Sequence, residues 1–428
     1  MDLFFKKNAT LLVLTALAAA CSDGGSTNTG GDTTGDTTGN TTGDIESTDS
    51  DSSSDTELTV NENGCVVGPI TIGSEAELEA YQSYSCVAGN LIVEGYDLTS
   101  LALPALTEVS GEFRIYGCYQ LTDLSGLSSL TRIGGVLYIK YNSNLTSLEG
   151  LNSLTSVGGR LEITDNDNLT DLSGLGALSS VGIDDWGISI AIMENADLVT
   201  LEGLGPIAEV NGLVRIQDNS SLASLEGLES LTRVGGSLQI LRDKSLASLA
   251  GLENLVETGG SFLIGFGLGN DALTSLDGLD SLTRVGENLN ISDNVRLTSV
   301  AGLKSLTQID GNFEVAGNTR LTNLDGLENL QTIGGVLIIG SYWSTSTGNT
   351  KLKSISGLGN LTTVGEAVSI ADNPVLPYCE ICALMENIQS LPASESIELA
   401  GNITDTCGDT TGYEFETNPL RLEALNCP

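Results

Sequence analysis

Short runs in which apolar and polar residues alternate recur along the chain from residue 89 onward. In one of these runs Leu161 and Ile163 are apolar, and the residues on either side of each are polar or charged. A period of two residues is typical of a short β-strand with one buried face. The element Leu-x-Ile-x-x-Asn, of which this run is one version, returns at a spacing of 24 residues wherever no insertion intervenes. The chain is therefore a series of repeats, and the repeat decides the fold.

A second pattern follows the strand in each repeat, because apolar residues then recur at every third position. In one repeat these residues are Leu145, Leu148, Leu151, Leu154 and Val157. A spacing of three fits neither a long α-helix nor a flat strand, so we expect short extended or 3₁₀ segments joined by corners. Glycines at fixed places in the repeat, such as Gly174, mark corners where the backbone needs a positive φ or a close approach.

A single repeat is too thin to bury its own leucines, whereas stacked repeats share one interior. The predicted fold is a β-rich solenoid, a right-handed single-stranded β-helix of about 12–13 turns with a short helical cap at each end. At roughly 4.8 Å per turn it would be a rod about 60 Å long. The recurrent Asn, for example Asn166, is expected at a corner where its amide bonds backbone groups. Asp243 and Cys118 replace it in two repeats, and we expect Cys118 to be a small buried thiol.

These repeats resemble the receptor L domain, the leucine-rich-repeat-related β-helix of insulin- and EGF-receptor ectodomains, over about residues 65–407. They are also similar to fungal GPI-anchored wall proteins and to many bacterial surface lipoproteins. The segment Cys65-Val-Val-Gly-Pro-Ile-Thr-Ile, followed by Cys86-Val-Ala-Gly-Asn-Leu-Ile-Val, is similar to the first turn of that family. The resemblance implies a disulfide between Cys65 and Cys86. Receptor L domains have fewer turns, so the chain is an extended relative.

The N-terminus has the pattern of an export signal. Lys6 and Lys7 precede a short apolar stretch that ends in Ala-Ala-Ala-Cys21. Small residues directly before a Cys resemble the lipobox of bacterial lipoproteins, which implies that Cys21 is acylated. Ser22, in place of Asp, resembles an outer-membrane address. The alternative is an ordinary signal peptide with a chance Cys.

The chain divides into five segments by composition. They are a lipoprotein signal peptide at 1–20, a lipidated Cys with a disordered acidic tether at 21–58, an N-terminal cap at 59–88, the solenoid at 89–377, and a Cys-rich C-terminal cap at 378–428. The tether has no Lys, Arg or aromatic residue after Cys21, so it cannot bury enough apolar surface to fold.

Each end of the solenoid carries a predicted capping helix. Ser74-x-x-Glu77 is a capping-box pattern that opens a helix from Glu75 to about Tyr84. Apolar residues at helical spacing predict a second helix from Glu380 to Ser390. Unpaired strand edges need such covers.

Four cysteines surround the C-terminal helix: Cys379, Cys382, Cys407 and Cys427. The Cys-x-x-Cys pair is compatible with a redox or zinc site, but export favours structural disulfides. Three pairings are open, of which Cys379–Cys407 with Cys382–Cys427 is favoured. Seven cysteines remain after acylation of Cys21, and we expect Cys118 to be the unpaired one.

The net charge and the residue content of the chain exclude several classes of function. The net charge of −39 opposes nucleic-acid binding, and the absence of His removes the usual general bases and metal ligands. No nucleophile elbow, phosphate loop or metal cluster occurs, so we expect no catalytic residue, cofactor or metal site. Acid pairs such as Asp165/Asp167 would bind Ca²⁺ weakly at most, because no loop has EF-hand spacing.

Insertions after or before strands hold the aromatic residues Trp186, Phe266, Tyr342 and Trp343. The simpler interpretation is that these loops cover rows of Leu; the other is that they contact a ligand. We therefore expect a non-enzymatic, lipid-anchored protein of the bacterial outer membrane or cell surface, which binds a protein or a glycan. The alternatives are an envelope scaffold without a specific ligand and, more remotely, a polysaccharide-active β-helix enzyme.

Overall fold

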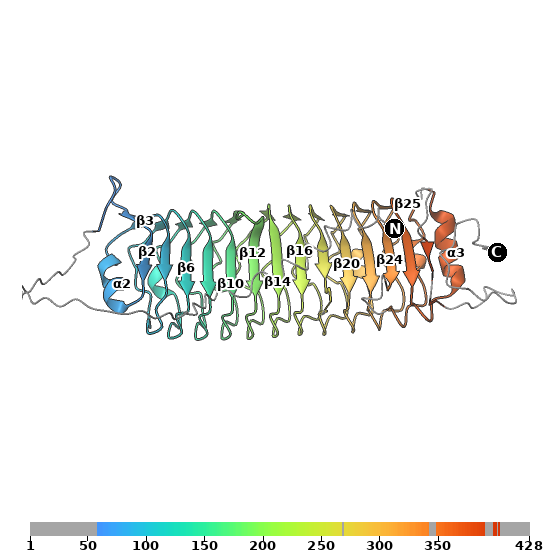
Figure 1. Ribbon diagram of the computed structural model, residues 1–428, viewed down its shortest axis with the longest axis horizontal. Coiled ribbons are helices and arrows are strands. Elements are labelled where there is room, and N and C mark those ends of the chain that lie inside the picture. The colour runs from blue at the N-terminus through green and yellow to red at the C-terminus, as the bar shows by residue number, and fades with distance from the viewer. Residues whose placement is uncertain (1–57, 268, 342–347, 390–396, 400, 403–428) are drawn as a thin grey trace, which may run out of the picture. The chain divides into compact units, whose positions relative to one another are not determined.

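The computed structural model describes residues 58–267, 269–341, 348–389, 397–399 and 401–402 of the 428-residue chain. These residues form a parallel β-solenoid, which confirms the fold predicted from the 24-residue repeat (Figure 1). Some residues singled out above lie outside the described part of the chain, namely Cys21, Tyr342, Trp343, Cys407 and Cys427.

One 14-stranded sheet runs the length of the solenoid, with every neighbouring pair parallel. Its strands are β2 (Ile70–Ile72), β4 (Leu91–Val93), β6 (Phe113–Tyr116), β8 (Leu137–Lys140), β10 (Leu161–Thr164), β12 (Ile188–Met193), β14 (Leu213–Gln217), β16 (Leu238–Leu241), β18 (Phe262–Ile264), β20 (Leu289–Ser292), β22 (Phe313–Ala316), β24 (Leu337–Gly340), β26 (Val368–Ala371) and β27 (Ile397–Glu398). All but β2 follow residue 89, so the predicted 12–13 turns agree with this sheet.

Two smaller sheets of very short strands form a second side. One contains β1 (Val66–Val67), β3 (Cys86–Ala88), β5 (Glu108–Val109), β7 (Arg132–Ile133), β9 (Ser156–Val157) and β11 (Ser180–Val181). The other contains β13 (Glu209–Val210), β15 (Arg233–Val234), β17 (Glu257–Thr258), β19 (Arg284–Val285), β21 (Gln308–Ile309), β23 (Thr332–Ile333) and β25 (Thr363–Val364). Short 3₁₀ turns lie, in chain order, between a strand of the large sheet and the next strand of a small sheet: η1 (Ser125–Leu127), η2 (Ala301–Leu303) and η3 (Ser356–Leu358). The insertion that contains Trp186 follows β11, where the first small sheet ends.

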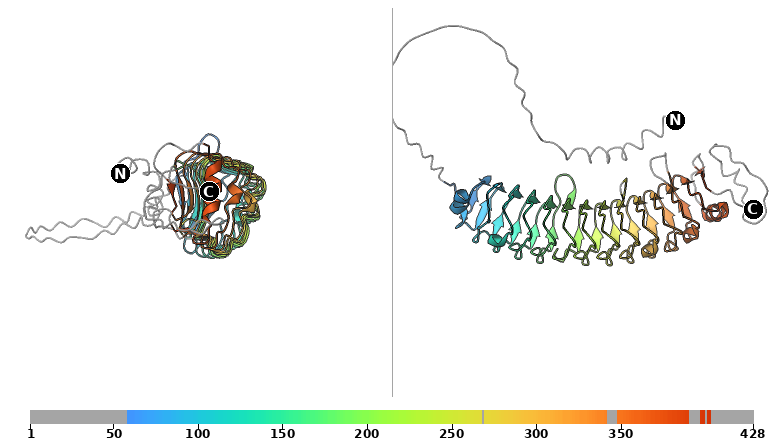
Figure 2. Two further views of the ribbon diagram at one scale, coloured as in Figure 1. Left: turned by 90° about the vertical axis from the view of Figure 1, so that its right-hand side faces the viewer. Right: turned by 90° about the horizontal axis from the view of Figure 1, so that it is seen from below.

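Leucines from equivalent positions of successive coils stack into one interior. Leu161 pairs in register with Leu137 of the coil before and with Ile190 of the coil after. All three are fully or almost fully buried, as are the apolar residues at every third position. The coils superpose when the solenoid is seen along its axis (Figure 2), so each coil completes the core of its neighbours.

The recurrent Asn forms a ladder inside one corner of the solenoid. The Asn166 backbone N–H donates to Asn195 Oδ1 at 3.0 Å, and Asn166 Nδ2 donates to the Ile139 carbonyl oxygen at 2.9 Å. The side chain of Asn166 is fully buried. The predicted structural role of this Asn is therefore confirmed, and Cys118 occupies the same position as a free, buried thiol.

Glycine is required at another corner because two coils approach closely there. Gly174 has φ +116°, and a Cβ on it would lie 2.1 Å from the Leu148 carbonyl oxygen of the previous coil. A side chain at this position would force the coils apart.

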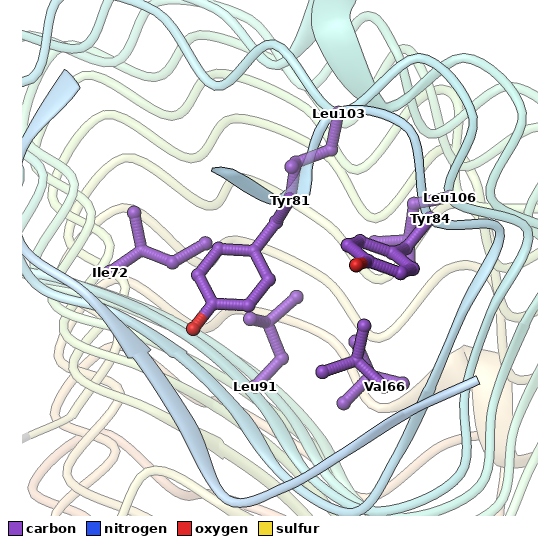
Figure 3. A pocket seen from close by; sticks show the side chains of 8 residues that line it. Val66, Ile72, Tyr81, Tyr84, Leu91, Leu103 and Leu106 are labelled. Atoms are coloured by element: carbon purple, nitrogen blue, oxygen red, sulfur yellow. The ribbon is translucent and has the colours of Figure 1, made fainter. Parts of the chain in front are cut away.

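A helix covers the first coil. Helix α2 (Glu75–Tyr81) starts where the capping box predicts, since Ser74 Oγ accepts from the Glu77 N–H at 3.3 Å. The helix ends three residues before Tyr84, the predicted end. Tyr81 and Tyr84 cover a small apolar hollow of about 10 Å³ at the end of the core (Figure 3). This space is close to the least that holds one water molecule, so it is no ligand pocket.

The C-terminal cap differs from its prediction in one disulfide. Helix α3 (Tyr378–Asn387) begins and ends slightly earlier than predicted. At the N-terminal end of the solenoid, Cys65 and Cys86 form a disulfide, as the resemblance implied. Cys379, however, carries a free thiol, so the predicted Cys379–Cys407 bond is wrong in this structure. Cys382 is disulfide-bonded. Because Cys382 is buried and Cys379 is only partly buried on the same helix, the two side chains have different surroundings that their spacing does not reveal.

Candidate ligand-binding surface

The loop between β11 and β12 presents Trp186 to solvent on a closed turn. Asp184 Oδ1 accepts from the backbone N–H of Trp186 at 3.0 Å and from that of Ile188 at 2.8 Å. The Asp184 N–H donates back to the Ile188 carbonyl oxygen at 3.0 Å, and Gly187 completes the turn with φ +80°. The Trp186 side chain is 72% exposed. The loop therefore displays an indole on a turn whose backbone is already hydrogen-bonded.

A layer of shielded charges lies beneath this loop. The Arg160 guanidinium on the coil before is 2.8 Å from Glu162 Oε2 and 3.3 Å from Asp184 Oδ2. The three side chains are only 10%, 8% and 4% exposed, respectively. Burial raises the pKa of Glu162, and the neighbouring Arg160 opposes that rise. A shielded charge destabilises the fold when it has no partner of opposite charge. Arg160 is the partner of both Glu162 on the strand and Asp184 on the loop, so it links these two elements.

Aromatic rings enclose the Arg160 guanidinium. Its central carbon is 5.1 Å from the centroid of the Tyr138 ring and 5.4 Å from that of Trp186. Arg114, on the other side of Tyr138, lies 5.0 Å from the same Tyr138 centroid. These distances are those of cation–π contacts. We call the set of residues Arg114, Tyr138, Arg160, Glu162, Asp184 and Trp186 the aromatic–arginine surface.

Tyrosines continue this surface toward the first coils. Tyr116 and Tyr141 meet edge to face with centroids 5.3 Å apart, and Lys140 Nζ lies 4.7 Å from the Tyr141 centroid. Tyr96 and Tyr119 stack at 5.5 Å, and Tyr96 is 73% exposed. Five of the ten tyrosines in the chain lie between residues 96 and 141. That uneven distribution is a signal for this surface that the sequence carries.

Comparison with known families gives the same fold. Residues 131–227 and 274–389 match the family described as Receptor L domain. The solenoid is receptor L-domain-like. The first matched segment contains Tyr138, Arg160 and Trp186 of the aromatic–arginine surface. No curated protein matches the chain.

Of the other predicted loop residues of the receptor L-domain-like solenoid, Phe266 does not lie next to Trp186, and Tyr342 and Trp343 lie outside the described residues. Phe266 follows β18, which is three strands beyond β12 in the large sheet and hence about 14 Å away. Phe266 is 40% exposed, and the neighbouring Gly267 N–H donates to Asp293 Oδ2 at 2.9 Å. Of the two predicted aromatic contacts that the structure describes, Trp186 and Phe266, only Trp186 lies against the Arg160 cluster.

Acidic side chains in the described part of the receptor L-domain-like solenoid form pairs and not metal-binding sites. Within the part of the chain that the structure describes, no group of three or more Cys, Asp or Glu is placed to hold a metal ion. Burial, followed by the nearby Glu194, raises the pKa of Asp165 to about 6.

Among the residues that the structure describes, no helix has the length and apolar character needed to cross a membrane.

Proposed function

We propose that this protein is a non-enzymatic recognition protein that binds a protein or glycan ligand through the aromatic–arginine surface. The observation that carries the proposal is the exposed Trp186 side chain on a loop held by Asp184, Arg160 and Glu162. Exposed Trp, Tyr and Arg side chains are the groups that contribute most to binding interfaces. A loop ordered before binding loses less conformational entropy when the ligand arrives.

The family likeness supports the same role. Receptor L domains are ligand-binding rather than catalytic units, and the first matched segment contains every residue of this surface except Arg114. The carboxyls with the highest pKa values, Asp243 and Glu314, lie on separate coils and do not form an acid–base pair. These observations favour recognition over hydrolysis of a polysaccharide.

We further propose that the solenoid is displayed from a bacterial envelope by acylation of Cys21. The lipobox-like sequence before Cys21 and the acidic tether after it support this location. The tether would span about 35 Å as a random coil, which places the solenoid clear of the lipid surface.

Binding of the full-length protein to a glycan array and to purified surface proteins of the same cell tests the proposal. Trp186→Ala should weaken binding of the ligand found by at least about tenfold, the effect of one interface hot spot. Val256→Ala is the matched control, because Val256 is exposed but lies next to β17 on the other side of the coils. A ligand whose affinity is unchanged by Trp186→Ala contradicts the proposed surface, and failure of the wild type to bind any probe favours a scaffold role.

A further inference from the structure

The Asn ladder has a fixed pattern of donors and acceptors. Where the position is an Asn, its Oδ1 accepts from the backbone N–H of the equivalent residue of the coil before, while its Nδ2 donates to a backbone carbonyl oxygen. Asn219 Nδ2, for example, donates to the Ile192 carbonyl oxygen at 3.0 Å. Asn270 Nδ2 donates to the Ile240 carbonyl oxygen at 3.0 Å and to Asn294 Oδ1 at 3.2 Å. Each Asn of the ladder therefore acts both as an acceptor and as a donor.

Asp243 occupies one position of this ladder and supplies only half of the pattern. Its Oδ1 accepts from the backbone N–H of Asn219 at 2.9 Å and from Asn219 Nδ2 at 3.2 Å. The Asp243 N–H donates to Asn270 Oδ1 at 3.0 Å, as an Asn in this position would. Asp243 Oδ2 is fully buried and has no hydrogen-bond partner.

The repeat shows what surrounds this second oxygen. Ile192, Ile216 and Ile240 are in register on β12, β14 and β16. By this register, Oδ2 of Asp243 takes the place of Nδ2, which faces the Ile216 carbonyl oxygen and Asn270 Oδ1. Both are acceptors, so an ionised Asp243 would place a negative oxygen against two oxygens without a donor. A protonated Asp243 supplies the missing O–H donor.

The charged residues near Asp243 do not reverse its preference for the protonated form. Burial is the main cause that raises the pKa of Asp243 to about 8, and the nearby Asp218 acts in the same direction. The hydrogen bonds from Asn219 and the charge of Arg242 oppose the rise. Arg242 is itself paired with Asp218 at 2.5 Å. The next charged residues, Lys244 and Asp271, are exposed to solvent.

We propose that Asp243 keeps a proton at neutral pH and that its loss in alkaline solution loosens the solenoid first around Asp243, in the coils that contain β14, β16 and β18. The sign follows from linkage, because the folded-state pKa of Asp243 lies above its unfolded value of 3.8. The contribution of the protonated group to stability is complete below the unfolded pKa. It falls as the pH rises and is lost once the pH passes the folded pKa near 8.

Urea unfolding of the full-length protein between pH 4 and pH 9, compared with Asp243→Asn, tests the proposal. Asn restores the donor of the ladder, so this variant should fold. The ratio of the two unfolding constants should change by up to about tenfold per pH unit between about pH 4 and pH 8 and then level off. Asn219→Asp is the matched control, because it places a second acid in the ladder and should add a second pH-dependent loss.

Infrared spectroscopy reads the protonation state directly. The wild type should show the C=O band of a buried carboxylic acid at pH 6 that is absent from Asp243→Asn and disappears above about pH 8. Hydrogen exchange at pH 9 should then be faster than in Asp243→Asn only in the coils that contain β14, β16 and β18. An ionised carboxylate at pH 6, or identical pH profiles of the wild type and Asp243→Asn, would overturn the proposal.

Discussion

Arg160 and Asp184 form an ion pair on the outside of the solenoid, with 3.3 Å between Arg160 Nε and Asp184 Oδ2, yet both side chains are shielded from solvent. Surface ion pairs are usually too exposed to fix a loop. Here the aromatic rings of Tyr138 and Trp186 enclose the guanidinium, so the pair lies in a less polar setting. The order of the Trp186 loop thus depends on a residue in the preceding coil.

Arg160→Ala should release the Trp186 loop. Glu162 and Asp184 would then be left without their cation, and the free energy of unfolding should fall by about 3 kcal/mol. Acrylamide quenching of Trp186 fluorescence, measured with Trp343→Phe in the background, should increase. Arg132→Ala is the control, because its pair with Glu108 is exposed and should contribute less than about 1 kcal/mol. Unchanged quenching would show that the loop is ordered without Arg160.

Asn294→Ala tests the ladder at a position that follows the regular pattern. Asn294 Oδ1 accepts from the backbone N–H and the Nδ2 of Asn270, and its own Nδ2 donates to the Ile264 carbonyl oxygen at 2.9 Å. Removal leaves several buried groups without partners, so chemical denaturation should show a loss of about 3 kcal/mol. Asn254→Ala removes an exposed side-chain bond to Glu229 and should cost less than about 1 kcal/mol. Equal losses in both variants would argue against a structural ladder.

The repeat could be predicted from the sequence, because its features are local. The alternation around Leu161 and the fixed Asn166 each report on the coil in which they occur. The aromatic–arginine surface could not be predicted in this way, since it depends on which residues of neighbouring coils lie in register. Tyr138 lies beside Glu162 because β8 and β10 pair, and an insertion of unpredictable shape brings Trp186 over Arg160.

Disulfide partners in the C-terminal cap were undetermined for a related reason. Cys379 and Cys382 are three residues apart on one helix, so both are near other cysteines in sequence. Which of them is buried depends on how helix α3 packs on the last coils, and the spacing of cysteines carries no information on that packing.

Glu314→Gln should make the protein more stable in alkaline solution. Burial, followed by the nearby Asp293, raises the pKa of Glu314 on β22 to about 7 from an ordinary value of 4.5. Because the folded-state pKa is raised, the protonated form stabilises the fold, and this contribution is lost as the pH rises from about 4.5 through 7. Thermal unfolding curves should therefore show that Glu314→Gln raises the free energy of unfolding by about 1–2 kcal/mol at pH 8 and leaves it unchanged at pH 4. A gain of the same size at both pH values would point to packing rather than ionisation.

Cys21→Ser tests the proposed anchor. Acylation requires the Cys21 thiol, so a cell fed a labelled fatty acid should incorporate the label into the wild type and not into Cys21→Ser. The variant should then be recovered in the soluble fraction, because a chain without acyl groups loses about 0.8 kcal/mol of membrane affinity for every CH₂ that would have been buried. Cys118→Ser is the matched control, since Cys118 is a buried thiol inside the solenoid and its replacement should leave the label in place. Membrane retention of Cys21→Ser together with a labelled acyl chain would contradict acylation at this residue.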